Sequence, residues 1–359
     1  MATLTLDGLN LTYGDGTHAV KEVDLSIEEG EFCVFLGPSG CGKTSTLRMI
    51  AGLETPTSGE IRLDDRVIND LYPGERDIAM VFQNYALYPN RTVRDHFEFP
   101  LKAHNIGKAE RDQRVAEIAE MLRMTELLES KPRQLSGGQA QRAAIGRALI
   151  RQPKLFLLDE PLTSLDTTLR LETRVALKRL QSELRITTVY VTHDQEEALS
   201  LADRIMIMHD GRVQQFANPE ELYREPKNLF VAGFVGTPAM NLLRGAVNDG
   251  QIVMGGFALP IGDAPVVDGD AVVAGVRPED LTIGHHTSES TGRIVVIEPQ
   301  GDERIISISL DRVPNTVIWK SRAPHARDGA EYEIGQPVSL TVRHGGLRLF
   351  NSRTESRIK

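Results

Sequence analysis

The chain has 359 residues, enough for two domains that each bury a core of their own. Its 41 lysines and arginines and 50 aspartates and glutamates give a formal net charge of −9, and only 5% of the residues are aromatic. Neither a basic patch nor an aromatic stacking platform is therefore expected, which argues against nucleic-acid binding. The only cysteines, Cys33 and Cys41, exclude a disulfide framework.

The N-terminal sequence MATLTLDGLN lacks the charged and apolar regions of a signal peptide. No apolar run approaches the roughly 20 residues that a membrane helix needs. The sequence therefore predicts a cytosolic protein that reaches a membrane only through a partner.

Residues 1–235 alternate short β-rich runs with helical patterns, which is typical of an α/β domain. Continuous apolar or β-branched runs suit the buried strands of a mostly parallel sheet, and they lie at residues 33–36, 155–158, 188–191 and 204–207. Between about 90 and 150 the periodicity becomes helical, with Val115, Ile118, Ala119 and Leu122 on one face. This stretch predicts a helical insertion between strands of the sheet.

The segment GPSGCGKT at residues 37–44 fits the pattern G-x-x-x-x-G-K-[ST] and lies between an expected strand and an expected helix. Such a loop wraps backbone N–H groups around phosphates at a helix N-terminus. Lys43 is expected to reach the β- and γ-phosphates of ATP, and Thr44 to bind Mg²⁺. The other residues expected to contact the nucleotide here are Gly37, Pro38, Ser39, Gly40, Cys41, Gly42 and Ser45.

Polar residues follow three more expected strands. Asp159 is predicted to lie near Mg²⁺, and Glu160 to act as general base for the attacking water. Gln83 and His193 each follow an apolar run, and the Gln83 amide is expected to touch Mg²⁺ or the water. Taken alone, either residue suits a structural role. Together with the other strand ends they indicate a ligand site at the carboxyl edge of the sheet.

The segment LSGGQAQR at residues 135–142 places a serine and two glycines at the expected start of a helix. This is a second element suited to phosphate. Its expected ligand-binding residues are Ser136, Gly137, Gly138 and Gln139.

After residue 235 the pattern changes. RIISISL and PVSLTVR alternate apolar and polar residues, and glycines and prolines separate such runs. This predicts a small antiparallel β barrel. The predicted domains are therefore residues 1–235 and 236–359.

Six motifs that occur in this order resemble the ATP-binding cassette of ABC transporters. The motifs are residues 37–44, Gln83, residues 135–139, Asp159-Glu160, the SLD triplet at 164–166, and His193. The resemblance implies a P-loop NTPase fold, ATP and Mg²⁺ as cofactors, and a head-to-tail homodimer. In that dimer the LSGGQ segment of one subunit faces the phosphate loop of the other. The resemblance also implies that Asp166 links the two ATP sites and that His193 contacts the γ-phosphate. Tyr13 resembles the aromatic that stacks on adenine, although a plain strand-end aromatic also suits its position.

Four further segments resemble importer ATPases for sugars, oligosaccharides, polyols or glycerol-phosphate: VFQNYALYP, VTHDQEEALSLADRI, NLFVAGFVGTPAMNLL and GVRPEDL. Members of that group carry a C-terminal oligonucleotide-fold-like (TOBE) domain. The resemblance implies two integral-membrane permeases, an extracytoplasmic solute-binding protein, and a place at the cytoplasmic face of the membrane. Importer ATPases for polyamines, iron or oxyanions share the architecture and are an alternative, since the C-terminal tail departs from the usual sequence of the sugar group.

The permeases are expected to dock around residues 84–89 and the helical insertion, unless the apolar residues there pack locally. An alternative of another class is a regulatory or binding protein that acts through the C-terminal domain. Arg277-Pro278-Glu279 and His285-His286 would be its candidate site, although a solvated turn and a surface histidine pair account for them more simply.

Overall fold

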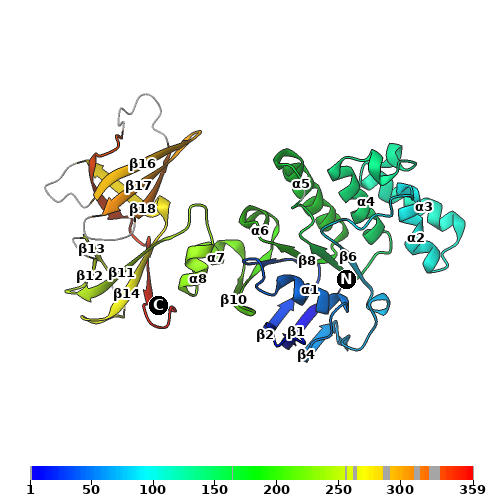
Figure 1. Ribbon diagram of the computed structural model, residues 1–359, viewed down its shortest axis with the longest axis horizontal. Coiled ribbons are helices and arrows are strands. Elements are labelled where there is room, and N and C mark those ends of the chain that lie inside the picture. Colours follow the sequence, from blue (N-terminus) through cyan, green and yellow to red (C-terminus); the bar gives the residue numbers. More distant parts are fainter. Residues whose placement is uncertain are drawn as a thin grey trace. The chain divides into compact units, whose positions relative to one another are not determined.

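Figure 1 shows the computed structural model of the chain, which describes residues 2–163, 165–254, 257–261, 265–285, 292–310, 316–322 and 332–358. The chain divides into two compact units, Met1–Pro219 and Glu220–Lys359. This division precedes the boundary expected at 235/236. Two short helices, α7 (Pro219–Arg224) and α8 (Leu229–Phe234), lie at or between the two positions. Helix α8 belongs to the second unit because Leu229 and Ala232 pack against Val273 and Phe350.

The central sheet of the first unit has six strands in the order β10-β9-β3-β8-β7-β6. Five of them run parallel: β3 (Phe32–Leu36), β6 (Ile78–Val81), β7 (Leu155–Asp159), β8 (Thr187–Thr192) and β9 (Arg204–His209). Strand β10 (Arg212–Ala217) pairs antiparallel with β9. Every residue of β3, β7 and β8 is buried, as expected for strands covered on both faces. The predicted mostly parallel sheet is confirmed.

A second, antiparallel sheet in this unit has the order β2-β1-β4-β5. Its strands are β1 (Leu4–Thr12), β2 (His18–Ile27), β4 (Ser58–Leu63) and β5 (Arg66–Val67). One core joins side chains of both sheets with those of helix α1 (Lys43–Ala51), as shown by the packing of Leu4, Phe35 and Leu47 in a single cluster. Helices α5 (Thr167–Leu184) and α6 (Gln195–Leu201) follow β7 and β8.

The predicted helical insertion consists of α2 (Val93–Ala103), α3 (Lys108–Met121) and α4 (Gly137–Leu149). Val115, Ile118 and Ala119 are its buried α3 face, as the periodicity predicts. Helix α2 packs closely on α4, where a Cβ added to Gly146 would lie 2.6 Å from Phe97 Cε1.

The second unit contains two antiparallel sheets, which confirms the predicted all-β character. The first, in the order β13-β12-β11-β14-β20-β21, consists of β11 (Asn241–Asn248), β12 (Gln251–Met254), β13 (Phe257–Pro260), β14 (Ala271–Val276), β20 (Leu347–Asn351) and β21 (Arg357–Ile358). The second, in the order β15-β19-β16-β17-β18, consists of β15 (Leu281–His285), β16 (Gly292–Gln300), β17 (Glu303–Leu310), β18 (Thr316–Arg322) and β19 (Pro337–Val342). Both sheets contribute to one core.

Within the described ranges, no helix is long and apolar enough to cross a membrane.

Candidate functional site

The loop between β3 and α1 packs tightly against neighbouring backbone. A Cβ added to Gly37 would lie 2.2 Å from the carbonyl oxygen of Met208, so only glycine fits there. Gly42 has φ 105°, and its added Cβ would lie 2.4 Å from Ala19 O. Lys43 is 4% exposed, and its ammonium donates to the carbonyl oxygens of Gly37 and Pro38, each at 2.8 Å. The loop therefore holds a buried cation at a helix N-terminus, an arrangement suited to phosphate oxygens.

Thr44 and Asp159 lie side by side, although they come from α1 and the end of β7. The Thr44 hydroxyl donates to Asp159 Oδ1 at 3.2 Å. Burial raises the pKa of the Asp159 carboxyl, although the bond from Thr44 opposes this shift. A hydroxyl and a carboxylate oxygen are ligands that Mg²⁺ accepts, so this pair fits the ion. Among the described residues no group of three or more His, Cys, Asp or Glu is placed to hold a metal.

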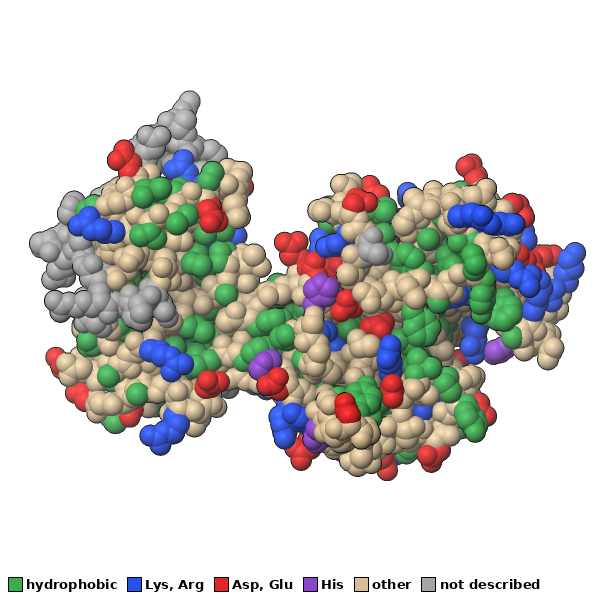
Figure 2. Space-filling model, viewed as in Figure 1, with side chains coloured by type: hydrophobic (Ala, Val, Ile, Leu, Met, Phe, Trp, Pro, Cys, Tyr) green, Lys and Arg blue, Asp and Glu red, His purple; other side chains and the backbone are tan. Residues whose placement is uncertain are grey.

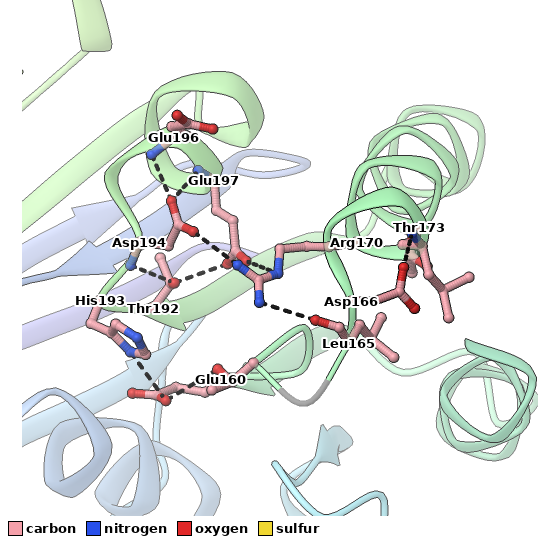
Figure 3. Close-up of polar contacts among 12 residues, drawn as sticks. Glu160, Leu165, Asp166, Arg170, Thr173, Thr192, His193, Asp194, Glu196 and Glu197 are labelled. Atoms are coloured by element: carbon pink, nitrogen blue, oxygen red, sulfur yellow. Dashed lines mark hydrogen bonds and ion pairs between the residues drawn. The ribbon is translucent and has the colours of Figure 1, made fainter. Parts of the chain in front are cut away.

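Glu160 and His193 follow β7 and β8 and meet at the carboxyl edge of the sheet (Figure 3). The Glu160 Oε2 atom lies 3.3 Å from His193 Nδ1 and also accepts from the Thr163 hydroxyl at 3.3 Å. Its backbone N–H donates to Val191 O at 3.0 Å, and its φ of 44° is in the left-handed region. Such strain in a residue other than glycine often occurs at functional sites.

Tyr13 lies next to the first turn of α1, because its hydroxyl is 3.0 Å from Ser45 Oγ. Gln83 is exposed and lies two residues beyond β6, which pairs with β7 at Val81 and Leu158. Over the described part of the chain no hydrogen bond joins the Gln83 side chain to Asp159 or Glu160. The structure thus brings the phosphate loop, Tyr13, the acid pair and His193 together, and Gln83 follows the strand that pairs with β7.

The LSGGQ segment begins α4. Ser136 caps the helix, with its Oγ accepting from Gln139 N at 3.4 Å and Gln139 Oε1 accepting from Ser136 N at 2.8 Å. Ser136 and Gly137 are exposed, whereas Gly138 is buried. A Cβ added to Gly138 would lie 2.7 Å from Leu169 Cδ1. Sequence reasoning missed this packing role, in which the glycine lets α5 approach α4.

Asp166 caps α5, since its Oδ1 accepts from Leu169 N at 3.1 Å. Ser164 of the same triplet lies outside the described residues. The structure therefore gives Asp166 a local structural role, and its predicted link between two ATP sites stays a prediction.

Arg147 of α4 is a residue that sequence reasoning missed. Its guanidinium donates to Tyr85 O at 3.0 Å and to Ala86 O. Tyr85 and Ala86 have φ values of 59° and 45°, so two consecutive residues other than glycine are held in the left-handed region. The LSGGQ helix is thereby tied to the segment that follows Gln83. An arginine that binds backbone carbonyls leaves no spacing signal in the sequence.

The Arg277-Pro278-Glu279 motif has a packing role in the second unit. Arg277 is buried, donates to the carbonyl oxygens of Tyr223 and Val235, and lies 4.0 Å from the centroid of the Tyr223 ring. The Tyr223 hydroxyl donates to Glu279 Oε1. The polar groups of Arg277, Tyr223 and Glu279 are therefore hydrogen-bonded within the second unit. The other candidates of this class, His286 and the His285 side chain, lie outside the described residues.

Replacing Lys43 with Ala is expected to weaken nucleotide binding about 10- to 100-fold, because a charge-assisted contact to phosphate is lost. A fluorescent nucleotide titrated into the isolated protein measures this. Lys154→Ala is a matched control, since Lys154 Nζ pairs with Asp64 at the exposed surface at 3.1 Å. Unchanged affinity in Lys43→Ala would contradict the predicted role of the loop.

Comparison with known proteins gives matches in both units. Three family descriptions match: ABC transporter at residues 20–163, CysA C-terminal regulatory domain at 241–283, and TOBE domain at 274–350. The xylose/arabinose import ATP-binding protein XacK of Haloferax volcanii is 44% identical, over 100% of this chain and 96% of its own. The sn-glycerol-3-phosphate import ATP-binding protein UgpC of Rhodopseudomonas palustris is 48% identical, over 96% of this chain and 91% of its own.

A solved structure matches the cassette. The dimeric ATP-binding cassette MJ0796, in a post-hydrolysis state bound to ADP and Pi, superposes with a TM-score of 0.55 at 37% identity. The match covers 60% of this chain and 98% of that chain. With relatives similar over their full length and a phosphate loop, acid pair and histidine assembled at one sheet edge, the chain belongs to the ABC transporter family, as an ATP-binding subunit that couples ATP hydrolysis to transport.

Proposed function

We propose that this chain drives solute import as a head-to-tail homodimer at the cytoplasmic face of a membrane, docked on two integral-membrane permeases. An extracytoplasmic solute-binding protein delivers the substrate to those permeases. The observation that carries the proposal is the convergence of Lys43, Asp159, Glu160 and His193 at the carboxyl ends of β3, β7 and β8. The similarity to import ATP-binding proteins over the full chain supports it.

The proposed chemistry assigns each residue one task. Lys43 and the N–H groups of the loop bind the β- and γ-phosphates, and Tyr13 stacks on adenine. Thr44, Asp159 and Gln83 hold Mg²⁺, which when bound offsets phosphate charge. Glu160 takes the proton of the attacking water, and His193, 3.3 Å away, orients the Glu160 carboxylate and the γ-phosphate.

The second phosphate cradle, residues 136–139, is proposed to act on the partner subunit's ATP. The N-terminus of α4 is exposed at Ser136 and Gly137, so it is open to a ligand from another chain. Within the described ranges no hydrogen bond joins it to the phosphate loop of its own chain. The dimeric state of the related cassette supports the arrangement. Asp166 would then lie between the two sites.

The proposed substrate class is a sugar, oligosaccharide, polyol or glycerol-phosphate, in keeping with what the relatives' names state. Importers of polyamines, iron or oxyanions are the alternative. The test is ATP hydrolysis by the complete permease complex in vesicles, with the binding protein loaded with one solute at a time. Stimulation by a sugar or by glycerol-phosphate supports the class, and stimulation only by a polyamine, iron or an oxyanion overturns it.

The proposed permease dock is an exposed aromatic surface formed by Tyr88 and Phe99, which are 50% and 55% exposed. Their ring centroids are 5.9 Å apart, and Tyr88 also stacks on His96 at 5.7 Å. The backbone N–H of Tyr88 donates to His96 Nε2 at 2.8 Å, which requires a neutral imidazole. Burial lowers the pKa of His96 and so favours that form. Figure 2 shows hydrophobic side chains at the surface around α2.

Phe99→Asp is expected to reduce co-purification with the permeases at least about tenfold, because a charge replaces an apolar contact at the centre of an interface. Nucleotide binding by the isolated variant serves as the folding check. Tyr72→Asp is the matched control, since Tyr72 is 78% exposed and lies outside this surface. Equal loss in both variants would contradict the placement of the dock.

A further inference from the structure

Arg170, one turn into α5, is in contact with two separate loops (Figure 3). Its Nη2 donates to the carbonyl oxygen of Leu165 at 3.1 Å, next to Asp166. Its Nη1 lies 3.5 Å from Asp194 Oδ2, which follows His193. Its Nε lies 4.0 Å from Glu197 Oε1. One guanidinium thus spans the distance from the start of α5 to the start of α6.

On the α6 side, hydrogen bonds hold the residues on either side of His193. Asp194 caps α6 by accepting from Glu196 N at 2.8 Å and Glu197 N at 3.2 Å. The Asp194 N–H donates to the Thr192 hydroxyl at 2.9 Å. Since His193 lies between Thr192 and Asp194 in the chain, fixing Asp194 restricts the backbone that carries the His193 imidazole.

Glu197 is a buried carboxylate, 3% exposed, at the bottom of this cluster. It accepts from the Tyr190 hydroxyl at 2.7 Å and the Thr192 hydroxyl at 2.9 Å. A buried carboxylate is costly unless it is paired. Arg170 is the cation that its side chain faces, with the Nε–Oε1 separation of 4.0 Å just outside hydrogen-bond range.

On the α5 side, the Leu165 side chain lies next to Gly137 at the start of the LSGGQ helix. A Cβ added to Gly137 would lie 3.1 Å from Leu165 Cδ2. Leu165 therefore contacts the second phosphate cradle with its side chain and Arg170 with its carbonyl oxygen.

The Arg170 Nε atom is buried and, among the described residues, has no hydrogen-bond partner. A buried donor of this kind is rare in folded proteins. A movement of about 1 Å of Arg170 towards Glu197 would bring the pair within the range of a charge-assisted hydrogen bond. The contact is thus incomplete in this arrangement and able to shorten in another.

We propose that Arg170 is a positioning residue that links the position of Leu165-Asp166 to that of His193. When the partner subunit contacts the loop at Asp166, Arg170 moves with Leu165, tightens on Asp194 and Glu197, and aligns His193 with Glu160. Contact with the partner at Asp166 thereby prepares His193 and Glu160 of the same chain for hydrolysis. This inference rests on the proposed roles of Asp166 and His193.

The test is a double-mutant cycle on ATP hydrolysis by the full chain. Arg170→Ala is expected to lower kcat on the order of tenfold, with KM for ATP within about twofold of the parent value. Asp194→Asn removes the charge while an N-cap of nearly equal strength remains. Because both changes break one linkage, the double variant should lose at most about twofold more than the worse single variant. Arg170→Lys should be intermediate, since a lysine cannot contact both loops as a planar fork does.

Arg179→Ala is the control, because Arg179 lies on the same helix and pairs with Glu183 at the exposed surface at 2.7 Å. The midpoint of thermal unfolding and the affinity for nucleotide are measured for every variant. If the losses multiply, or if Arg170→Ala raises KM and lowers the unfolding midpoint in step with kcat, Arg170 has only a structural role. If Arg170→Ala hydrolyses ATP at the parent rate, the linkage is wrong while the proposed function stands. If the complete permease complex in vesicles hydrolyses no ATP with any loaded binding protein, the proposed function itself is refuted.

Discussion

Glu160→Gln is expected to lower the rate of ATP hydrolysis about 10²–10⁴-fold while nucleotide binding stays intact. The amide has the shape of the carboxylate but cannot take a proton from water. The backbone of Glu160 is held by its bond to Val191 O and by the end of β7, so the substitution should leave the loop in place. Phosphate release by the purified chain measures the rate, and nucleotide titration measures the binding.

A second readout separates the loss of a base from a loss of structure. If ATP drives closure and hydrolysis reverses it, Glu160→Gln should accumulate ATP-bound dimers that size-exclusion chromatography resolves. Glu129→Gln is a suitable control, since Glu129 pairs with Arg94 at the exposed surface at 2.8 Å. Hydrolysis at the parent rate in Glu160→Gln would assign the base to another group.

Ser136→Arg is expected to spare ATP binding by the single chain and to abolish both dimer closure and hydrolysis. Ser136 is exposed at the N-terminus of α4, where a long cationic side chain would occupy the space proposed for the partner subunit's phosphates. The loss of the N-cap costs only about 1 kcal/mol of helix stability. Analytical ultracentrifugation with and without ATP, in the Glu160→Gln background, measures closure.

Mixing two defective chains tests the head-to-tail arrangement directly. A mixed dimer of Ser136→Arg and Lys43→Ala chains has one composite site with both elements intact, made of the phosphate loop of the first and the cradle of the second. At an ATP concentration too low for Lys43→Ala chains to bind it, the mixture should therefore dimerise and retain one nucleotide per dimer, whereas neither variant should do so alone. If the mixture remains monomeric, or if Ser136→Arg alone closes, residues 136–139 do not act across an interface.

The parts of the site that the sequence predicted are local. The phosphate loop is contiguous, and the close approach of Gly37 to Met208 explains why glycine is present in the motif. Asp159 and Glu160 were predictable because a buried parallel strand ends at the sheet edge where ligands bind. The alternation in RIISISL correctly predicted the buried side chains of β17.

The features that the sequence did not predict depend on which elements face each other. The antiparallel β2-β1-β4-β5 sheet and the assignment of α8 to the second unit follow from packing between distant segments. Gly138 looks like part of a phosphate cradle in the sequence, yet its lack of a side chain also makes room for Leu169. Arg147 and Arg170 bind carbonyl oxygens, which every residue carries, so no residue type marks their partners.

Helix α4 carries a proposed functional element near each of its ends. Its first residues form the exposed cradle, and Arg147, two residues before its last, holds the strained turn at Tyr85 and Ala86. Thirteen residues of α-helix span about 20 Å. On the proposed role of residues 136–139, a tilt of α4 that seats Ser136 on a phosphate would displace the turn that precedes Tyr88. Nucleotide capture at the start of α4 and movement of the aromatic surface at Tyr88 and Phe99 would then be one motion.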